Sequence, residues 1–154
     1  HCISIDPYYL MHKSEISGYT PKIMRAARQI NDEMHEWVFA DFIQSMKEKR
    51  VNLDSIEVTV FGYTFKQNCS DTRNTKIKNL MLLMKENNIK FSLWDPLISE
   101  QDHDELNTLG FKTLKSSPKN IKVAFICVYH DEFVEFFKNF NGIVYDYKNS
   151  ARAE

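Results

Sequence analysis

The spacing of apolar residues divides the chain near residue 51 into a helical part and a part that alternates strands with helices. Thr20-Pro21 is a typical helix start, and no glycine or proline interrupts the chain from there until past Arg50. Apolar side chains recur every three or four residues at Ile23, Ala27, Ile30, Met34, Val38 and Phe42, with Trp37 and Met46 beside them. The pattern predicts one helix over residues 21–49, about 28 residues and about 42 Å long.

This predicted helix is much longer than the usual globular helix of about 11–12 residues. A helix of this kind bridges two domains or packs against its own copy in a dimer. The alternative is a long helix packed only on its own domain. We expect a homodimer in which the apolar stripe through Ile23, Ile30, Met34, Trp37 and Val38 crosses the same stripe of a second copy.

Strands and helices alternate after a short polar connector at 51–55, which is the best domain boundary in the chain. The run V-A-F-I-C-V at 123–128 is apolar on both faces, as in a central parallel strand, and Cys127 is therefore predicted to be a core residue. The pattern predicts strands at 56–61, 90–94, 110–114, 123–128 and 142–146, and helices at 74–87, 99–109 and 131–139. This alternation predicts an α/β fold, with the long helix followed by a Rossmann-like, doubly wound parallel sheet.

The loop after the first strand carries candidate binding chemistry. It turns at Gly62, carries Lys66 and Arg73, and leads into the helix predicted at 74–87, whose first turn has unpaired N–H groups. Ligands of doubly wound sheets bind at the carboxyl ends of the strands. We therefore predict an anion site on this loop, most simply for a phosphate, with two solvated surface cations as the alternative.

The opening segment, residues 1–19, shows no sustained period, and Pro7 favours an extended backbone at Asp6. Cys2 could be a nucleophile, with Asp6 four positions later orienting water, or it could be a structural cysteine. His130 follows a predicted strand, so it is either a residue facing a ligand or an ordinary loop histidine.

Composition limits the classes of function. With 154 residues, 43% of them apolar and 13% aromatic, the chain has the makeup of a globular protein. The net charge of −1 provides no general attraction for nucleic acid or a membrane, and no apolar run approaches the roughly 20 residues of a membrane span. Three widely spaced cysteines form neither a disulfide framework nor a metal pattern, which favours reduced thiols in the cytoplasm.

Nucleotide-binding fingerprints are missing from the sequence. The four glycines form no G-x-G-x-x-G, whose close backbone approach a dinucleotide pyrophosphate needs, and there is no P-loop. The chain is therefore not expected to contain the unit that grips NAD. It also begins at His1 rather than Met, so we expect it to be a portion of a longer protein.

Two motifs together resemble a known family. The opening H-C-I-S-I-D-P-Y-Y-L resembles the catalytic-cysteine segment of the UDP-glucose/GDP-mannose dehydrogenases, closest to the branch acting on UDP-N-acetylhexosamines. The stretch F-G-Y-T-F-K-Q-N-C-S-D-T-R-N-T at 61–75 is similar to the signature of that family's carboxy-terminal nucleotide-sugar domain, and Asp95-Pro96 fits as well. The resemblance implies a two-step, NAD-dependent oxidation of a sugar 6-hydroxymethyl group to a carboxylate, serving surface polysaccharide synthesis.

The resemblance also implies roles for particular residues. Cys2 matches the nucleophile that forms a thiohemiacetal and then a thioester, and Asp6 matches the aspartate that assists water. Phe65 and Lys66 match residues that hold the UDP-sugar, and Arg73 matches one that contacts NAD from this domain.

The implied organisation is a catalytic-cysteine segment at 1–19, a central dimerisation helix at 20–50 and a UDP-binding α/β domain at 54–154. The amino-terminal NAD-binding domain is expected to be absent from this chain, which is therefore expected to be inactive alone. One departure concerns Ile5, which stands where the glucose-type enzymes have a lysine, and this argues against UDP-glucose as the substrate.

Two other classes compete with this interpretation. One is a non-catalytic nucleotide-sugar-binding or regulatory α/β module. The other is a stand-alone cysteine hydrolase, which is disfavoured because no histidine is placed as its base.

Overall fold

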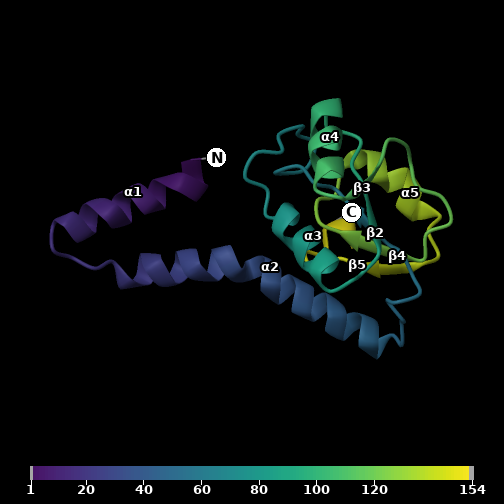
Figure 1. Cartoon of the computed structure of the whole chain (residues 1–154), viewed down its shortest axis with the longest axis horizontal. Helices are drawn as coiled ribbons and strands as arrows, with labels where there is room; N and C mark the ends of the chain where they lie inside the picture. The colour runs from purple at the N-terminus through teal and green to yellow at the C-terminus, as the bar shows by residue number, and fades with distance from the viewer. Residues whose placement is uncertain (1, 153–154) are drawn as a thin grey trace.

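A computed structural model describes residues 2–152 and shows a helical hairpin projecting from an α/β domain (Figure 1). Helix α1 (Cys2–Ile16) runs antiparallel to α2 (Lys22–Glu48), and the carboxy-terminal half of α2 lies against the domain. Within the described residues, no helix combines the length and hydrophobicity needed to cross a membrane.

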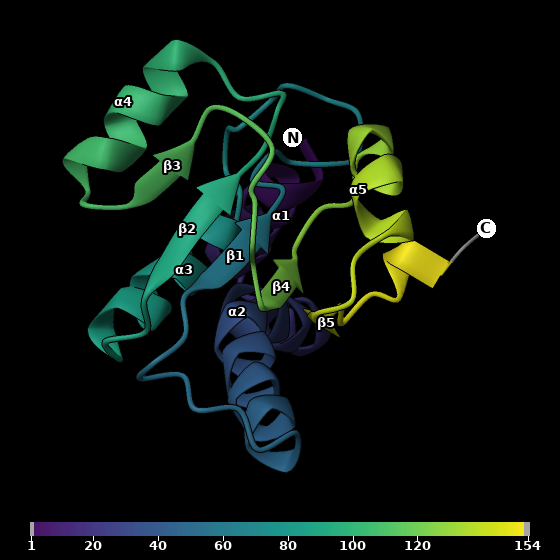
Figure 2. The same ribbon diagram turned by 90° about the vertical axis from the view of Figure 1, so that its right-hand side faces the viewer.

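The domain is built on one parallel sheet of five strands in the order β3-β2-β1-β4-β5 (Figure 2). The strands are β1 (Val58–Phe61), β2 (Phe91–Trp94), β3 (Lys112–Leu114), β4 (Val123–Ile126) and β5 (Ile143–Tyr145). The predicted α/β fold with a parallel sheet is confirmed. Each strand is shorter than the range predicted for it, with bounds that differ by one to two residues at an end in most cases.

One face of the sheet is covered by α2 and by α3 (Ile77–Glu86). The apolar residues of α3 recur at steps of three, four and seven, as on one face of a helix, and all are buried there against inward side chains such as Val58, Val60 and Leu93. They are Ile77, Leu80, Met81 and Met84. Helix α4 (Glu100–Thr108) begins with a capping box between Ser99 and Asp102.

The other face has an aromatic cover over the carboxyl ends of β1 and β2. Phe61 and Trp94 pack there against Phe133, in the short helix η1 (Asp131–Phe133), and against α5 (Val134–Lys138). The predicted helix at 131–139 is therefore a 3-10 turn followed by a short α-helix. The connection from β3 to β4 contains no helix, so the amino-terminal half of this face lacks such a cover. The short helix η2 (Ser150–Arg152) follows β5.

The long helix α2 is buried along only half of its length. Phe42 and Met46 are fully buried under the sheet, whereas Ile23 and Ile30 are 87% and 62% exposed. Val38, which the pattern placed on the dimer stripe, is instead a core residue of its own domain. The part of α2 from Val38 onward packs on the sheet, so Val38 is covered within a single chain.

The opening segment corrects a second expectation. Helix α1 runs through Pro7, so Asp6 is helical rather than extended. Proline disfavours a helical residue before it but does not forbid one, and packing on α2 compensates here. The Tyr8 hydroxyl donates to Asp32, and the Arg28 guanidinium lies 5.0 Å from the centre of the Tyr8 ring.

Candidate functional site

The carboxyl ends of β1 and β4 approach each other closely at Gly62. Its φ is +81°, and a Cβ at this position would lie 2.1 Å from the Val128 carbonyl oxygen. Only glycine tolerates both the left-handed backbone and this contact. The turn that begins the Lys66–Arg73 loop therefore depends on a residue without a side chain.

We expect Gly62→Ala to destabilise the protein more than Gly18→Ala does, as measured by urea unfolding. Gly18 has φ +82°, but a Cβ added there would have no neighbouring atom within 4 Å, so it reports backbone strain alone. That strain costs about 1 kcal/mol, and the clash at Gly62 should add at least about 1 kcal/mol. Equal losses in the two variants would contradict a steric role for the Val128 contact.

A buried carboxylate anchors this turn. The side chains of Asp95 and His130 are both 0% exposed, and His130 Nε2 lies 3.1 Å from Asp95 Oδ2. The same oxygen accepts the backbone N–H groups of Tyr63 (2.6 Å) and Thr64 (3.1 Å), and Oδ1 accepts the N–H of Leu97 (2.8 Å). Burial on its own would raise the pKa of Asp95, but hydrogen bonds from His130, Tyr63 and Leu97 outweigh burial and lower it.

The hydrogen bonds of His130 define its tautomer. The Asn68 backbone N–H donates to Nδ1 (3.0 Å), so Nδ1 carries no proton and the neutral ring is protonated on Nε2. Both Asp95 and the Thr64 hydroxyl (3.2 Å) lie at this one nitrogen. In a catalytic triad the acid and the nucleophile occupy opposite nitrogens. His130 is therefore a buried structural histidine in the loop after β4, rather than a residue that faces a ligand.

A second set of bonds ties the loop to the end of β4. Gln67 and Asn68 donate from their side-chain amides to Asp131 (3.0 and 2.7 Å), and the Asp131 backbone N–H donates back to Asn68 Oδ1 (3.1 Å). Phe65 and Lys66 stand just before these anchors, with Phe65 43% exposed and Lys66 exposed. No hydrogen bond or ion pair to the Lys66 ammonium occurs within residues 2–152. The loop is thus held at both ends, and these two side chains project from it.

Arg73 lies on a different part of the loop. Its guanidinium forms a two-point bond with Asp71 (3.0 and 2.7 Å), which lowers the pKa of Asp71 to about 2. Arg73 also lines a hollow of about 360 Å³ with Tyr63 and Asp102, whereas Lys66 is not part of this lining. Lys66 and Arg73 thus lie in separate surroundings on the loop, although the sequence predicted one anion site shared by both.

Cys2 and Asp6 lie on α1, both exposed. Residues four apart lie on the same face of a helix, so the thiol and the carboxylate share one side of α1. Further along α1, Tyr8 lines a hollow of about 310 Å³ together with Asn74 and Lys76. Lys76 also donates to Asp32 of α2 (2.8 Å). The start of α1 therefore lies beside the segment leading into α3, as Figure 1 shows.

The other two cysteines are placed differently. Cys127 is buried at the end of β4, and burial raises the pKa of its thiol to about 12, which confirms the prediction of a core residue. Cys69 is half-buried on the loop and, like Cys2, carries a free thiol. In the part of the chain that the structure describes, no three His, Cys, Asp or Glu side chains are grouped as metal ligands would be.

Sequence reasoning missed the pairing of Asp95 with His130. A signal was present, because each residue comes at or shortly after the end of a strand that neighbours β1 in the sheet. That signal becomes readable only once the strand order is known.

Comparisons with known proteins agree with this geometry. A family model described as "UDP-glucose/GDP-mannose dehydrogenase family, UDP binding domain" matches residues 59–152. The chain is 41% identical over 102 residues to UDP-N-acetyl-D-glucosamine 6-dehydrogenase of Pseudomonas aeruginosa, covering 66% of this chain and 24% of that protein. It is 33% identical over 162 residues to the Salmonella typhi protein of the same name, covering 100% of this chain and 38% of that protein. The chain thus spans well under half the length of these relatives.

Solved structures show the same fold. A UDP-glucose dehydrogenase from Pyrobaculum islandicum superposes with a TM-score of 0.74 at 19% identity, covering 98% of this chain and 35% of that one. A GDP-mannose dehydrogenase from Pseudomonas aeruginosa gives 0.73 at 14% identity, covering 94% and 34%.

Proposed function

The chain belongs to the UDP-glucose/GDP-mannose dehydrogenase family, and on this premise we propose that it is the UDP-sugar-binding portion of an NAD-dependent nucleotide-sugar 6-dehydrogenase. The substrate we propose is a UDP-N-acetylhexosamine, oxidised in the cytoplasm to its uronic acid for surface polysaccharide synthesis. The names of the relatives, which include UDP-N-acetyl-D-glucosamine and UDP-N-acetyl-D-mannosamine dehydrogenases, support this substrate class.

The observation that carries the proposal is the anchored loop at the carboxyl edge of the sheet. Ligands of doubly wound sheets bind at this edge. Phe65 offers a partly exposed ring, and Lys66 offers an ammonium that no described side chain neutralises. Because Asp95 and His130 hold the turn beneath them, little ordering of the loop remains to be done when UDP-sugar binds.

Cys2 and Asp6 are proposed as the reacting pair. The sulfur of Cys2 would hold carbon 6 of the sugar covalently, and the Asp6 carboxylate on the same face of α1 would assist the water that releases the product. The position of α1 beside Asn74 and Lys76 supports a site shared between this helix and the domain.

The residues of this chain do not form the main binding site for NAD. A single glycine, Gly62, follows β1, and α3 begins only at Ile77, so the glycine-rich turn into a helix that cradles a pyrophosphate is not built here. Arg73 is proposed to contact NAD from this domain, through a side chain that is 75% exposed.

A second copy of the chain is the proposed protein partner. Helix α2 leaves Ile23, Ile30 and Trp37 exposed, while α1 packs on its opposite side through Arg25 and Arg28. The stripe is thus free to meet the same stripe of another copy.

The test is a calorimetric titration of UDP into the wild-type protein and the Lys66→Ala variant. A hydrogen bond to a charged group is worth about 1.5–3 kcal/mol, so the variant should bind UDP about ten-fold more weakly or worse. Lys47→Ala, which removes an equal charge from the exposed side of α2, should leave the affinity unchanged. Equal affinity in the Lys66 variant, or no preference for UDP over inorganic phosphate, would contradict the proposal.

The second candidate function is a nucleotide-sugar-binding or regulatory module without chemistry of its own. The lack of a G-x-G-x-x-G motif for a dinucleotide in these 154 residues favours this second function. The two functions share the UDP site and differ in whether the Cys2 sulfur reacts.

A further inference from the structure

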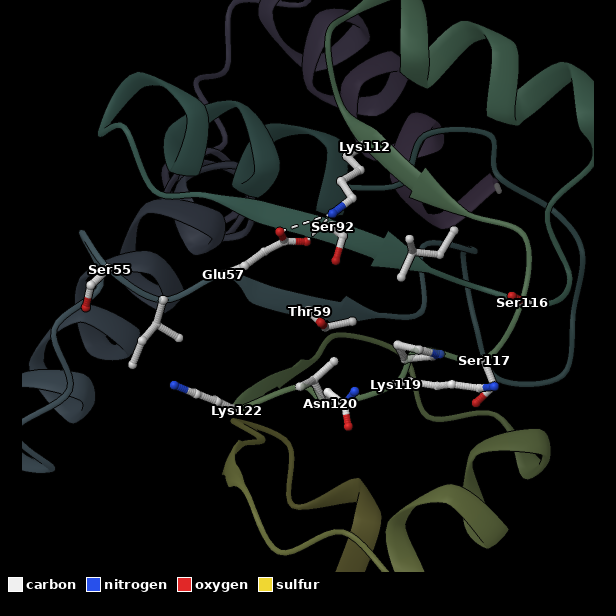
Figure 3. Close-up of a pocket in the computed structure, with 14 residues that line it drawn as sticks. Ser55, Glu57, Thr59, Ser92, Lys112, Ser116, Ser117, Lys119, Asn120 and Lys122 are labelled. Carbon is white, nitrogen blue, oxygen red and sulfur yellow. Dashed lines mark hydrogen bonds and ion pairs between the residues drawn. The ribbon is translucent and has the colours of Figure 1, made fainter.

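Two hollows of the molecule differ in which elements form their walls. The hollow of about 620 Å³ at the amino-terminal end of the sheet is lined by residues of the α/β domain, among which Lys112 and Glu57 pair with each other (Figure 3). The hollow of about 310 Å³ beside Tyr8 has walls from α1, from α2 and from the segment that leads into α3. Ile5, one residue before Asp6, lines it. This smaller hollow therefore borders the part of α1 that carries the proposed reacting pair.

One carboxylate on the wall of the smaller hollow joins all three elements. Asp32 of α2 accepts a hydrogen bond from the Tyr8 hydroxyl of α1, and another from the Lys76 ammonium, which lies 2.8 Å away at the N-cap of α3. The Arg28 guanidinium lies 3.2 Å from the same carboxylate. Hydrogen bonds from Lys76 and Tyr8 lower the pKa of Asp32, because they outweigh the effect of burial. These four residues form the Asp32 cluster, whose members lie far apart in the sequence.

Arg28 makes the packing of α1 depend on the charge of Asp32. The Arg28 side chain is 12% exposed, and its guanidinium lies 5.0 Å from the centre of the Tyr8 ring. Its Nε is buried without a hydrogen-bond partner within residues 2–152, where Asp32 is the carboxylate that pairs with this cation. Removing the negative charge would leave Arg28 and Lys76 as two like charges beside Tyr8, so Tyr8 and the helix that carries it should move.

The hairpin has a second polar anchor, which serves as a comparison. The Arg25 guanidinium of α2 donates to the Glu15 carboxylate near the end of α1, on the side of the hairpin turn. Figure 1 shows that this turn lies away from the domain, whereas the opposite end of α1 lies beside the segment before α3. The Asp32 cluster is therefore the anchor at the end of α1 that carries Cys2.

We propose that Asp32 is a positioning residue, which fixes the distance between the Cys2 thiol on α1 and the UDP-sugar loop of the domain. The proposal rests on the proposed function, since it takes Cys2 as the group that reacts with the sugar. Lys76 directly follows the stretch 61–75, which contains that loop. Placement matters here, because a displacement of about 1 Å can cost about 100-fold in rate. By holding Tyr8 and Lys76 at one point, Asp32 keeps the reacting helix in place against the binding loop.

The first measurement is the distance between α1 and the domain, read by pulsed electron paramagnetic resonance. One nitroxide label is placed on the exposed Cys2 and the other on α3 through Glu86→Cys. Cys69→Ser removes the half-buried thiol, and Cys127 is too deeply buried to be labelled. We expect a narrow distance distribution, and we expect Asp32→Asn to broaden or shift it while urea unfolding shows that the variant remains folded.

The second measurement separates positioning from a merely structural role. Saturating UDP-N-acetylglucosamine should slow the alkylation of Cys2 by iodoacetamide about five-fold or more in the wild-type protein, as read by mass spectrometry. In Asp32→Asn this protection should fall below about two-fold, while the affinity for UDP stays within about two-fold of wild type by calorimetry. Asp32→Glu, which keeps the carboxylate, should recover the protection and the narrow distribution. Glu15→Gln, at the other anchor, should change neither.

Several results would overturn the role of Asp32. They are a distance distribution that Asp32→Asn leaves unchanged, an equal disturbance by Glu15→Gln, a loss of UDP affinity as large as the loss of protection, and bound UDP-N-acetylglucosamine that does not protect Cys2 in the wild-type protein. A wild-type protein that does not bind UDP in calorimetry would instead contradict the proposed function. The distance measurement uses no ligand, so it would still decide whether Asp32 positions α1.

Discussion

Replacing Ile30 and Met34 with glutamate is expected to convert a homodimer of this protein into a folded monomer of 18.2 kDa. Ile30 and Met34 are 62% and 42% exposed in the single chain, although both belong to the apolar stripe of α2. Burying a large apolar side chain contributes about 1.5–3 kcal/mol, and an unpaired glutamate in the same place opposes burial. In a two-fold dimer each substitution acts twice, so the loss of association should be complete at micromolar protein.

The measurement is light scattering coupled to size exclusion, with urea unfolding to show that the variant remains folded. Val38 is left unchanged because it belongs to the core of its own domain, and a charge there would unfold the chain rather than report on association. Gln29→Glu with Ala40→Glu adds the same charge to exposed positions of α2 outside the stripe and should preserve the dimer. A wild-type protein that elutes as a monomer at tens of micromolar would overturn the assignment.

Periodicity predicted most of the fold because it reports burial directly. The stripe of α3 and the apolar run of β4 are buried as their spacing indicates, and the order of strands and helices follows. Periodicity could not tell where along α2 the burial stops. Met34 and Val38 share one stripe, but only Val38 reaches the sheet, and that depends on where the tertiary fold places α2.

Helix α1 shows a second limit of local patterns. Its sequence has no helical period and contains Pro7, so the backbone around Asp6 was expected to be extended. Helix α1 is held by contacts with α2, among them Tyr8 with Asp32 and Arg25 with Glu15. A short stretch of sequence around Asp6 does not contain these partners. Tertiary packing here outweighs the local preference.

The candidate site, too, could be predicted from the sequence only in part. Lys66 was indicated by the charged loop, and Phe65 and Lys66 together by the resemblance of one continuous stretch, and their roles remain predictions. The residues that position them come from three strand ends, with Asp95 and His130 brought together only by the order β2-β1-β4. A buried pair of this kind depends on topology, which a single sequence does not display.

Asp95→Asn is expected to destabilise the protein by about 3 kcal/mol and to loosen the Lys66 loop. The carboxylate accepts hydrogen bonds from Tyr63, Thr64, Leu97 and His130, and all of it is buried. An amide has one acceptor oxygen, and its NH₂ group would face donors, so at least one buried N–H loses its partner. Breaking a buried charge-assisted network in this way typically costs about 3–5 kcal/mol when one member is removed. Faster hydrogen exchange at the Tyr63 and Thr64 amides would locate the loss at the loop.

The same substitution should change how stability depends on pH. The pKa of Asp95 is lowered from 3.8 in the folded protein, so the folded state binds fewer protons here than the unfolded state does. Its contribution is therefore complete above that ordinary value and is lost as the pH falls through the lowered one. The stability gap between wild type and Asp95→Asn should narrow as the pH falls from about 5 toward 3, measured by urea unfolding. Asp104→Asn, which changes an exposed carboxylate on α4, should stay within about 0.5 kcal/mol of wild type throughout. A gap that does not vary with pH would mean that Asp95 acts through its shape alone, and its charge would then have no part in anchoring the loop.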